Sequence, residues 1–374
     1  MAAEDPFADL DRWLERVADV FARPEPRLLL EQMTVGLLSP LPAKNGRTLA
    51  EHAGHGRPGR VQTFLCRGAW DAGLLERRVR DMVLVEFGDP EGILVVDETR
   101  ILKKGRRTVG VAPQRCPASG RIENCQVVVS LAYAGRGGSA FIGYRLHLPA
   151  LWTGDPVRCR TARIPPEVGF ATLGDQAVQL LVEADAAGVP YGWVAVGVGP
   201  GRHRQVRDHL TLRGRPYVAA VSRDLRLAAV HGAGSPHDLR RVGDLVERTS
   251  CDEVPSRRQG TGTDPLHGWE CTAVALPDEP PAEGFEHILL FRRAPGEPER
   301  ASCLLAHAPR DTRSRDMVWV AGHLPPGGGA EEPGRSLVGL GSHQVRTWTA
   351  FHHHVAVCLF AHAFASARRS DRGN

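Results

Sequence analysis

The stretch Ile93-Leu94-Val95-Val96-Asp97-Glu98-Thr99 decides how the rest of this 374-residue sequence is interpreted. Its four consecutive apolar residues predict a short buried strand. Asp97 follows the run directly, so we expect its carboxyl group at the point where the strand ends. An acidic side chain in such a place is a candidate metal ligand or general base, and Glu98 beside it is a second candidate.

The composition is that of a soluble globular protein with one or two domains, since 42% of the residues are hydrophobic and 24% are charged. The net charge of +4 is only mildly basic, whereas a dedicated DNA-binding enzyme usually carries a denser positive surface. The eight cysteines form no CxxC pair, which favours free thiols in a reducing cytoplasm.

The start of the given sequence does not predict a signal peptide. The first eleven residues are acidic and do not have the basic-then-apolar order of a signal peptide. No apolar stretch approaches the roughly 20 residues that span a bilayer. We therefore expect a cytoplasmic protein with no membrane contact.

Apolar periodicity divides the chain into four parts. Residues 1–90 predict a helical N-terminal region, in which Pro24 and Pro26 are expected to end the first helix. Residues 91–204 predict an α/β segment, with strands at 93–96, 126–134, 140–148 and 191–196 and a helix at 177–187. Residues 205–315 predict a β-rich segment with strands at 217–221, 272–276 and 287–291, and residues 316–374 end in a long apolar helix at 348–368.

Several blocks of the sequence resemble a known family. The longest are Leu94–Thr99 with Leu102-Lys103-Lys104-Gly105, Gly120–Val127 (GRIENCQV) and Leu146–Thr153 (LHLPALWT). Shorter ones lie near both ends of the chain: Lys44-Asn45-Gly46, Trp70-Asp71-Ala72, Val345–Thr349 and Ala361–Phe364. Together they resemble the IS701-type DDE transposases over nearly the whole chain.

The resemblance implies an α/β fold with an RNase H-like core, a helical N-terminal region and a β-rich insertion before the last catalytic residue. If the resemblance holds, residues 91–204 form the first part of the core, residues 205–315 form the insertion, and residues 316–374 form the helical C-terminal part of the core. In the family, three carboxylates hold two divalent metal ions that act on a phosphodiester. The first of these carboxylates aligns with Asp97.

The other two family acids are missing at the aligned positions. The second acid falls on Gly197 and the third on Gly328, and glycine has no side chain to offer a cation. Glu331 and Glu332 lie near Gly328 and stay open as substitutes. We therefore expect that metal-dependent DNA strand transfer has been lost, and that the protein uses neither a metal nor another cofactor.

Polar residues that remain around the first block are candidates for a new role. Lys103 and Lys104 meet an anionic substrate or belong to a solvated turn. Arg121, Glu123 and Asn124 bind that substrate or form a structural polar network. Glu98 is a catalytic base, or a scaffold carboxylate paired with Lys103 or Arg121.

The stretch Gly197-Val198-Gly199-Pro200-Gly201 is predicted to be a glycine-rich loop between a strand and a helix. Such a loop exposes backbone N–H groups to an anion, so Gly199 and Gly201 are candidate anion-binding positions together with Arg202 and His203. A plain turn is the alternative. The stretch does not fit GxGxxG, and a dinucleotide site is not expected.

The consecutive histidines His352, His353 and His354 are candidate metal ligands. Neighbouring residues of a helix point about 100° apart, however, so at most one or two of these side chains could bind the same ion. A structural role is favoured.

Three functions remain open for the whole chain: a metal-independent enzyme of specialised metabolism, a domesticated DNA-binding protein without cleavage activity, and an inactive transposase relic. The first would perform elimination or ring closure on a small molecule activated by phosphate or sulfate, and a protein partner is conceivable for any of them.

Overall fold

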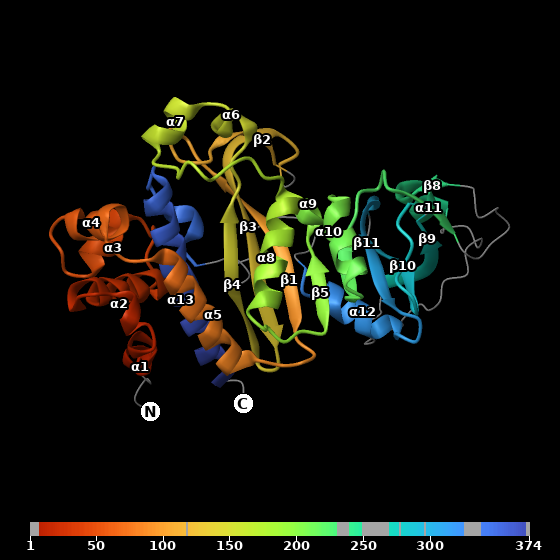
Figure 1. Cartoon of the computed structure of the whole chain (residues 1–374), viewed down its shortest axis with the longest axis horizontal. Helices are drawn as coiled ribbons and strands as arrows, with labels where there is room; N and C mark the ends of the chain where they lie inside the picture. The colour runs from red at the N-terminus through yellow and green to blue at the C-terminus, as the bar shows by residue number, and fades with distance from the viewer. Residues whose placement is uncertain are drawn as a thin grey trace. The chain divides into compact units, whose positions relative to one another are not determined.

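The computed structural model describes residues 7–116, 119–229, 239–248, 269–276, 278–294, 297–324 and 338–371 as a mixed α/β protein (Figure 1). The chain divides into two compact units. The first comprises Met1–Asp89, Thr99–Ala171 and Glu331–Asn374, and the second comprises Pro90–Glu98 and Thr172–Ala330. Among the described residues, no helix combines the length and the apolar character needed to cross a bilayer.

The first unit begins with helices. These are α1 Leu10–Glu15, η1 Ala18–Val20, α2 Pro24–Leu38, α3 Gly46–His52, α4 Gly59–Arg67 and α5 Ala72–Phe87. The side chains of Asn45 and Asp71 accept hydrogen bonds from the first turns of α3 and α5. The prediction that Pro24 and Pro26 end a helix is wrong. Pro24 opens α2, where the N–H that proline lacks would have no helical partner in any case.

The long helix α13, Trp348–Asp371, is the core of the first unit and packs against α2, α4 and α5. Figure 1 shows it in blue beside α5. Every residue from Val355 to Ala361 is buried, so the helix is covered on all sides. The Trp13 ring of α1 meets Phe360 and Phe364 edge to face, with ring centroids 6.1 and 5.7 Å apart. The apolar run predicted at residues 348–368 is thus confirmed as a buried helix.

Three antiparallel strands complete the first unit together with two short helices. β2 Ala112–Arg115 pairs with β3 Ile122–Gly135, and β3 pairs with β4 Gly138–Leu146. α6 Ala150–Thr153 and α7 Pro156–Thr161 follow β4. The buried hydroxyl of Tyr133 on β3 donates to the carbonyl of Asp89 and accepts from its N–H, both at 2.8 Å. The strands predicted at 126–134 and 140–148 are therefore present; β3 is longer than expected, and β4 begins and ends two residues earlier than expected.

The second unit contains parallel strands. β1 Ile93–Leu102 runs parallel to β5 Trp193–Val196, which runs parallel to β6 Tyr217–Ala220. The prediction that the first strand ends at Asp97 is wrong. β1 continues through Thr99 to Leu102, because Ile101 returns to the core and is buried. Its last residues, Thr99–Leu102, belong to the first unit.

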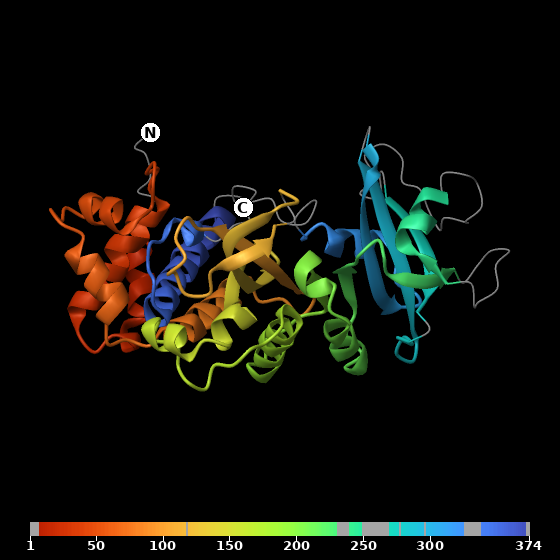
Figure 2. The same cartoon turned by 90° about the horizontal axis from the view of Figure 1, so that it is seen from above.

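Antiparallel strands extend this sheet in the second unit. β6 pairs with β11 Glu297–Pro309, β11 with β10 Phe285–Ala294, β10 with β9 Trp269–Ala275, β9 with β7 Arg226–Ala229, and β7 with β8 Arg240–Arg241. Helix α11 Val242–Arg248 buries Val242, Leu245 and Val246 against these strands (Figure 2). The remaining helices of this unit are α8 Leu173–Ala186, α9 Val198–Gly201, α10 Arg204–Leu212 and α12 Ser314–Ala321.

The contact of α1 with α13 gives a stability prediction. Replacement Trp13→Ala removes a ring that is 2% exposed, so we expect it to lower the free energy of unfolding by about 3–5 kcal/mol. Trp319→Ala is the matched control, because the Trp319 ring is 57% exposed and its loss should change the free energy by about 0.5 kcal/mol or less. Urea unfolding followed by circular dichroism measures both. Equal losses for the two variants would contradict the packing described for α13.

Candidate functional site

The parallel pairing of β1 with β5 brings Asp97 and Gly197 together. Val96 and Val196 are the last paired residues of the two strands. The residues that follow them, Asp97 and Gly197, are therefore neighbours. The Gly197 N–H donates to the Val96 carbonyl at 2.7 Å, which fixes the two chains at this point. The backbone therefore places Asp97 and Gly197 side by side.

No side chain fits at Gly197 as the residues stand. A Cβ atom built on Gly197 would lie 1.9 Å from Oδ1 of Asp97 and 2.2 Å from its Cγ, well inside van der Waals contact. The Asp97 carboxyl group thus fills the space that any side chain at position 197 would need. Its Oδ1 also accepts the Glu98 N–H at 2.8 Å, which holds the carboxyl in this orientation.

The glycine-rich stretch after β5 forms a helical turn, α9, so the prediction of an open loop is wrong. Each glycine marks a close approach: a Cβ atom at Gly199 would lie 2.1 Å from Oε2 of Glu98, and one at Gly201 would lie 2.2 Å from the Ala220 carbonyl oxygen. The N–H groups of Gly201 and His203 donate to the carbonyls of Gly197 at 2.8 Å and Pro200 at 3.0 Å. These N–H groups are used within the protein and are not presented to an anion.

A buried ion pair that the sequence reasoning missed anchors this turn. Arg207 of α10 is 4% exposed and binds both carboxylate oxygens of Glu279, at 2.8 and 2.7 Å. Its third donor reaches the Gly201 carbonyl at 2.8 Å, so the pair holds the end of α9. The sequence gives one indication that Arg207 is buried. It directly follows Val206 and lies one turn before Leu210, and both of these apolar residues are buried. Arg202, by contrast, is exposed.

Burial changes the protonation of Asp97. The atoms packed around the carboxyl group raise its pKa to about 7, because they remove the water that would stabilise the charged form. The hydrogen bond from the Glu98 N–H acts in the opposite direction, and the nearby Glu98 carboxylate raises the pKa further. At neutral pH the neutral form of Asp97 is therefore far more populated than that of an ordinary aspartate.

Comparison with known proteins identifies the source of this arrangement. The family model described as DDE superfamily endonuclease matches residues 16–250, which is well over half of the chain. The chain belongs to the DDE superfamily endonucleases. A comparison with curated proteins gives no match. The matched segment contains Asp97 and Gly197, while Gly328 lies beyond it.

Positions 97 and 197 of this DDE superfamily member together supply one carboxyl group, that of Asp97, toward the metal pair that the family implies. Position 197 has no side chain, and the Asp97 carboxyl lies in the space where a second acidic side chain would stand. Gly328, Glu331 and Glu332 lie outside the described residues. In the part of the chain that is described, no group of three or more His, Cys, Asp or Glu side chains could hold a metal ion.

The other predicted site residues lie in the first unit. Lys103 donates from Nζ to the carbonyls of His343 at 2.8 Å and Gly341 at 3.1 Å, and burial lowers its pKa to about 8. Asn124 donates to the carbonyls of Lys103 at 2.6 Å and Gly105 at 3.1 Å, so it holds the turn after β1. These two residues therefore use their donors on the backbone.

The remaining candidates of that group lie nearer the surface. Lys104 and Arg121 are exposed, and Glu123 accepts a hydrogen bond from the Ser119 hydroxyl at 3.4 Å. Their role in substrate binding stays a prediction.

The three consecutive histidines of α13 point to three different sets of partners. His352 bonds the Tyr144 hydroxyl at 2.8 Å, and His353 faces the carbonyls of Leu65 at 2.8 Å and Trp70 at 3.0 Å. His354 faces the Gly339 carbonyl at 3.1 Å. Each ring therefore joins α13 to a different neighbouring segment of the first unit.

A double-mutant cycle tests the close approach of Asp97 and Gly197. We expect Gly197→Ala to lower the free energy of unfolding by about 1–3 kcal/mol, because the new methyl group overlaps the carboxyl. In an Asp97→Ala background the loss should be smaller, since only the Cβ atom of residue 97, 2.9 Å away, remains in the way. Gly59→Ala is the control, because a Cβ atom there meets nothing within 4 Å. Additive losses in urea unfolding would disprove the approach.

The raised pKa of Asp97 predicts a pH dependence with a definite sign. Because the pKa is about 7 in the folded chain and near 3.8 when unfolded, the stability from this group is complete below the unfolded value. It is lost as the pH rises through the folded value. Between about pH 5 and about pH 8 we expect the wild type to lose on the order of 3 kcal/mol relative to Asp97→Asn. Parallel stability curves for the two proteins would contradict the raised pKa.

Proposed function

We propose that this DDE superfamily member is a transposase-derived protein of the IS701 type that no longer catalyses metal-dependent DNA strand transfer. The observation that carries the proposal is the position of the Asp97 carboxyl in the space of a side chain at residue 197. Two divalent ions need several oxygen ligands from separate segments of the chain. A centre in which one carboxyl packs directly against the backbone of the second ligand position does not leave room for that arrangement.

The strand pattern supports an RNase H-like origin of the fold. Parallel strands β1, β5 and β6 carry Asp97 and Gly197 at neighbouring positions, and the antiparallel pair β3–β4 follows β1 in the chain. The antiparallel strands of residues 205–315 support the assignment of that segment as an insertion, with 1–90 as the helical N-terminal region and 316–374 as the C-terminal part of the core.

The chemistry that remains is proton transfer. A carboxyl group with a pKa near the working pH serves as a general base and then as a general acid. We infer that Asp97, with Glu98 beside it, removes a proton from a small molecule that carries a phosphate or sulfate ester. The electron pair of the broken bond forms a double bond or closes a ring, the carbon–oxygen bond to the ester breaks, and phosphate or sulfate leaves. Arg202 and His203, in the same unit, are candidates to bind the leaving anion.

This reaction requires neither a metal nor another cofactor, and it suits a cytoplasmic protein acting on activated metabolites. The family match supports a second candidate function, since a DDE endonuclease acts on DNA and a member that no longer cleaves could still bind it. The two functions differ in which molecule is bound and in whether any bond breaks.

Phosphate and sulfate release in the presence of EDTA tests the proposal. We expect the full chain to release one of these anions from at least one member of a panel of alkyl phosphate and sulfate esters. Asp97→Asn should slow the release about 10²–10⁴-fold, and Glu98→Gln is assayed beside it. Asp244→Asn, which changes an exposed carboxylate of the same unit, is the control and should keep the wild-type rate.

Two outcomes would count against the proposal. Nicking of duplex DNA that requires Mg²⁺ or Mn²⁺ and disappears in Asp97→Asn would show that the metal centre works. Absence of release from the whole panel, with duplex binding that weakens steeply as salt rises, would favour the DNA-binding function.

A further inference from the structure

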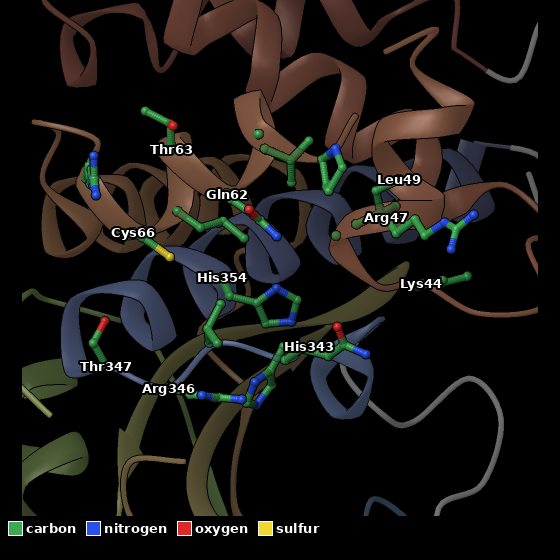
Figure 3. A pocket seen from close by; sticks show the side chains of 18 of the residues that line it. Lys44, Arg47, Leu49, Gln62, Thr63, Cys66, His343, Arg346, Thr347 and His354 are labelled. Carbon is green, nitrogen blue, oxygen red and sulfur yellow. The ribbon is translucent and has the colours of Figure 1, made fainter. Parts of the chain in front are cut away.

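The first unit contains a cavity of about 610 Å³, a size typical of small-molecule sites (Figure 3). Its wall is formed by α3, α4, the segment just before α13 and His354 of α13 itself. Arg163 completes the wall and adopts a left-handed backbone conformation, with φ of 58°, which is uncommon for a residue other than glycine. Segments far apart in the sequence therefore meet around one space.

The charges of the wall are all of one sign. Five cationic side chains line the cavity, and the lining residues include no aspartate or glutamate: Lys44, Arg47, Arg67, Arg163 and Arg346. Arg47 is paired with Glu51 at 2.8 Å. Within the described parts of the chain, Arg67, Arg163 and Arg346 have no carboxylate within ion-pair distance. A wall of this kind attracts a ligand with more than one negative charge.

Neutral hydrogen-bonding groups face the same space. His343 is 5% exposed, and neither of its ring nitrogens has a hydrogen-bond partner among the described residues; the same is true of the buried hydroxyl of Thr347. Figure 3 shows His343, Arg346 and Thr347 on one side of the cavity, with Gln62, Thr63 and Cys66 of α4 on the other. Buried polar groups normally have a partner, so these atoms point to a polar ligand.

The segment that presents these groups is held in place. Lys103 bonds the carbonyls of Gly341 and His343, and the Val109 N–H donates to the Arg346 carbonyl at 3.1 Å. Burial lowers the pKa of His343 to about 2, with smaller contributions from His354 and Lys103, so its ring stays neutral. A neutral imidazole offers one donor and one acceptor.

We propose that this cavity is a binding site for a phosphorylated small molecule of about nucleotide size. Arg67, Arg163 and Arg346 neutralise the phosphate oxygens, and His343 and Thr347 supply hydrogen bonds from the wall. Arginine suits this task because its planar fork of donors matches phosphate geometry. Duplex DNA presents its phosphates along an outer surface, whereas these donors converge on a space of limited volume. The site does not depend on the reaction proposed for Asp97.

Calorimetric titration of the full chain with inorganic pyrophosphate and with ADP tests the proposal. We expect one site that binds pyrophosphate, and tighter binding of ADP where the rest of the cavity accepts the nucleoside. Arg163→Gln and Arg346→Gln should each weaken binding about tenfold or more. Gln344→Glu, which adds a negative charge to the wall, should weaken it as well, and Thr347→Val by a few-fold, all with unchanged thermal melting.

Arg60→Gln is the matched control, because Arg60 is an exposed arginine of α4 that does not line the cavity. Asp97→Asn should bind pyrophosphate as the wild type does, which separates this site from the reaction proposed above. If ADP binds but pyrophosphate does not, and Arg346→Gln abolishes the binding of ADP, the site is still supported. The ligand is then a nucleotide rather than a simple phosphate.

The proposal would be overturned in two ways. One is the absence of binding of both probes at about 1 mM and low salt, or binding that the arginine variants leave unchanged. The other is binding of a duplex of roughly 20 base pairs that the same variants weaken while neither probe binds, since the cavity would then be part of a DNA surface.

Discussion

A carboxyl oxygen and a Cβ atom cannot lie 1.9 Å apart, and this constraint links Asp97 to Gly197. Neighbouring strands are only about 4.7–4.9 Å apart, and the β1–β5 register places the two residues at the same level of the sheet. In a metal centre, cations would lie between two carboxylates at such positions. Here one carboxyl packs directly against backbone, so glycine at 197 and the orientation of Asp97 depend on each other.

The same close packing explains the chemistry left at this point. A carboxyl group that loses its water through burial is more stable in the neutral form, and the pKa of Asp97 accordingly rises to about 7. Glu98 lies against Gly199 of α9, so the second carboxyl is also held by a glycine of the same turn. Helix α9 is held by Arg207, which donates to its last carbonyl and forms an ion pair with Glu279. Removing one member of this buried pair would be costly, because the other charge would remain without its partner.

Much of the fold could be predicted from the sequence, because burial leaves a periodic signal. The apolar runs at 126–134, 177–187 and 348–368 became β3, α8 and α13 for that reason. The role of Pro24 was missed because proline is compatible both with the end of one helix and with the start of the next. From the sequence alone the glycines of α9 predict an exposed loop, whereas in the structure their close contacts with Glu98 and Ala220 require glycine. The sequence contains no information about such distant contacts until the strand register is known.

The site residues also differ in whether a local sequence pattern indicates them. Asp97 and Gly197 could be found from the sequence because each directly follows a run of apolar residues. The cavity of the first unit could not, because its arginines come from segments about 300 residues apart, which only the fold brings together. The two features are nevertheless connected by one requirement. Phosphate chemistry needs positive charge, and where the acidic ligands for metal ions are absent, that charge has to come from side chains that are cationic at every physiological pH. In the cavity proposed above, Arg67, Arg163 and Arg346 would supply it beside a neutral buried imidazole, since among the described residues none of the three has a carboxylate within ion-pair distance.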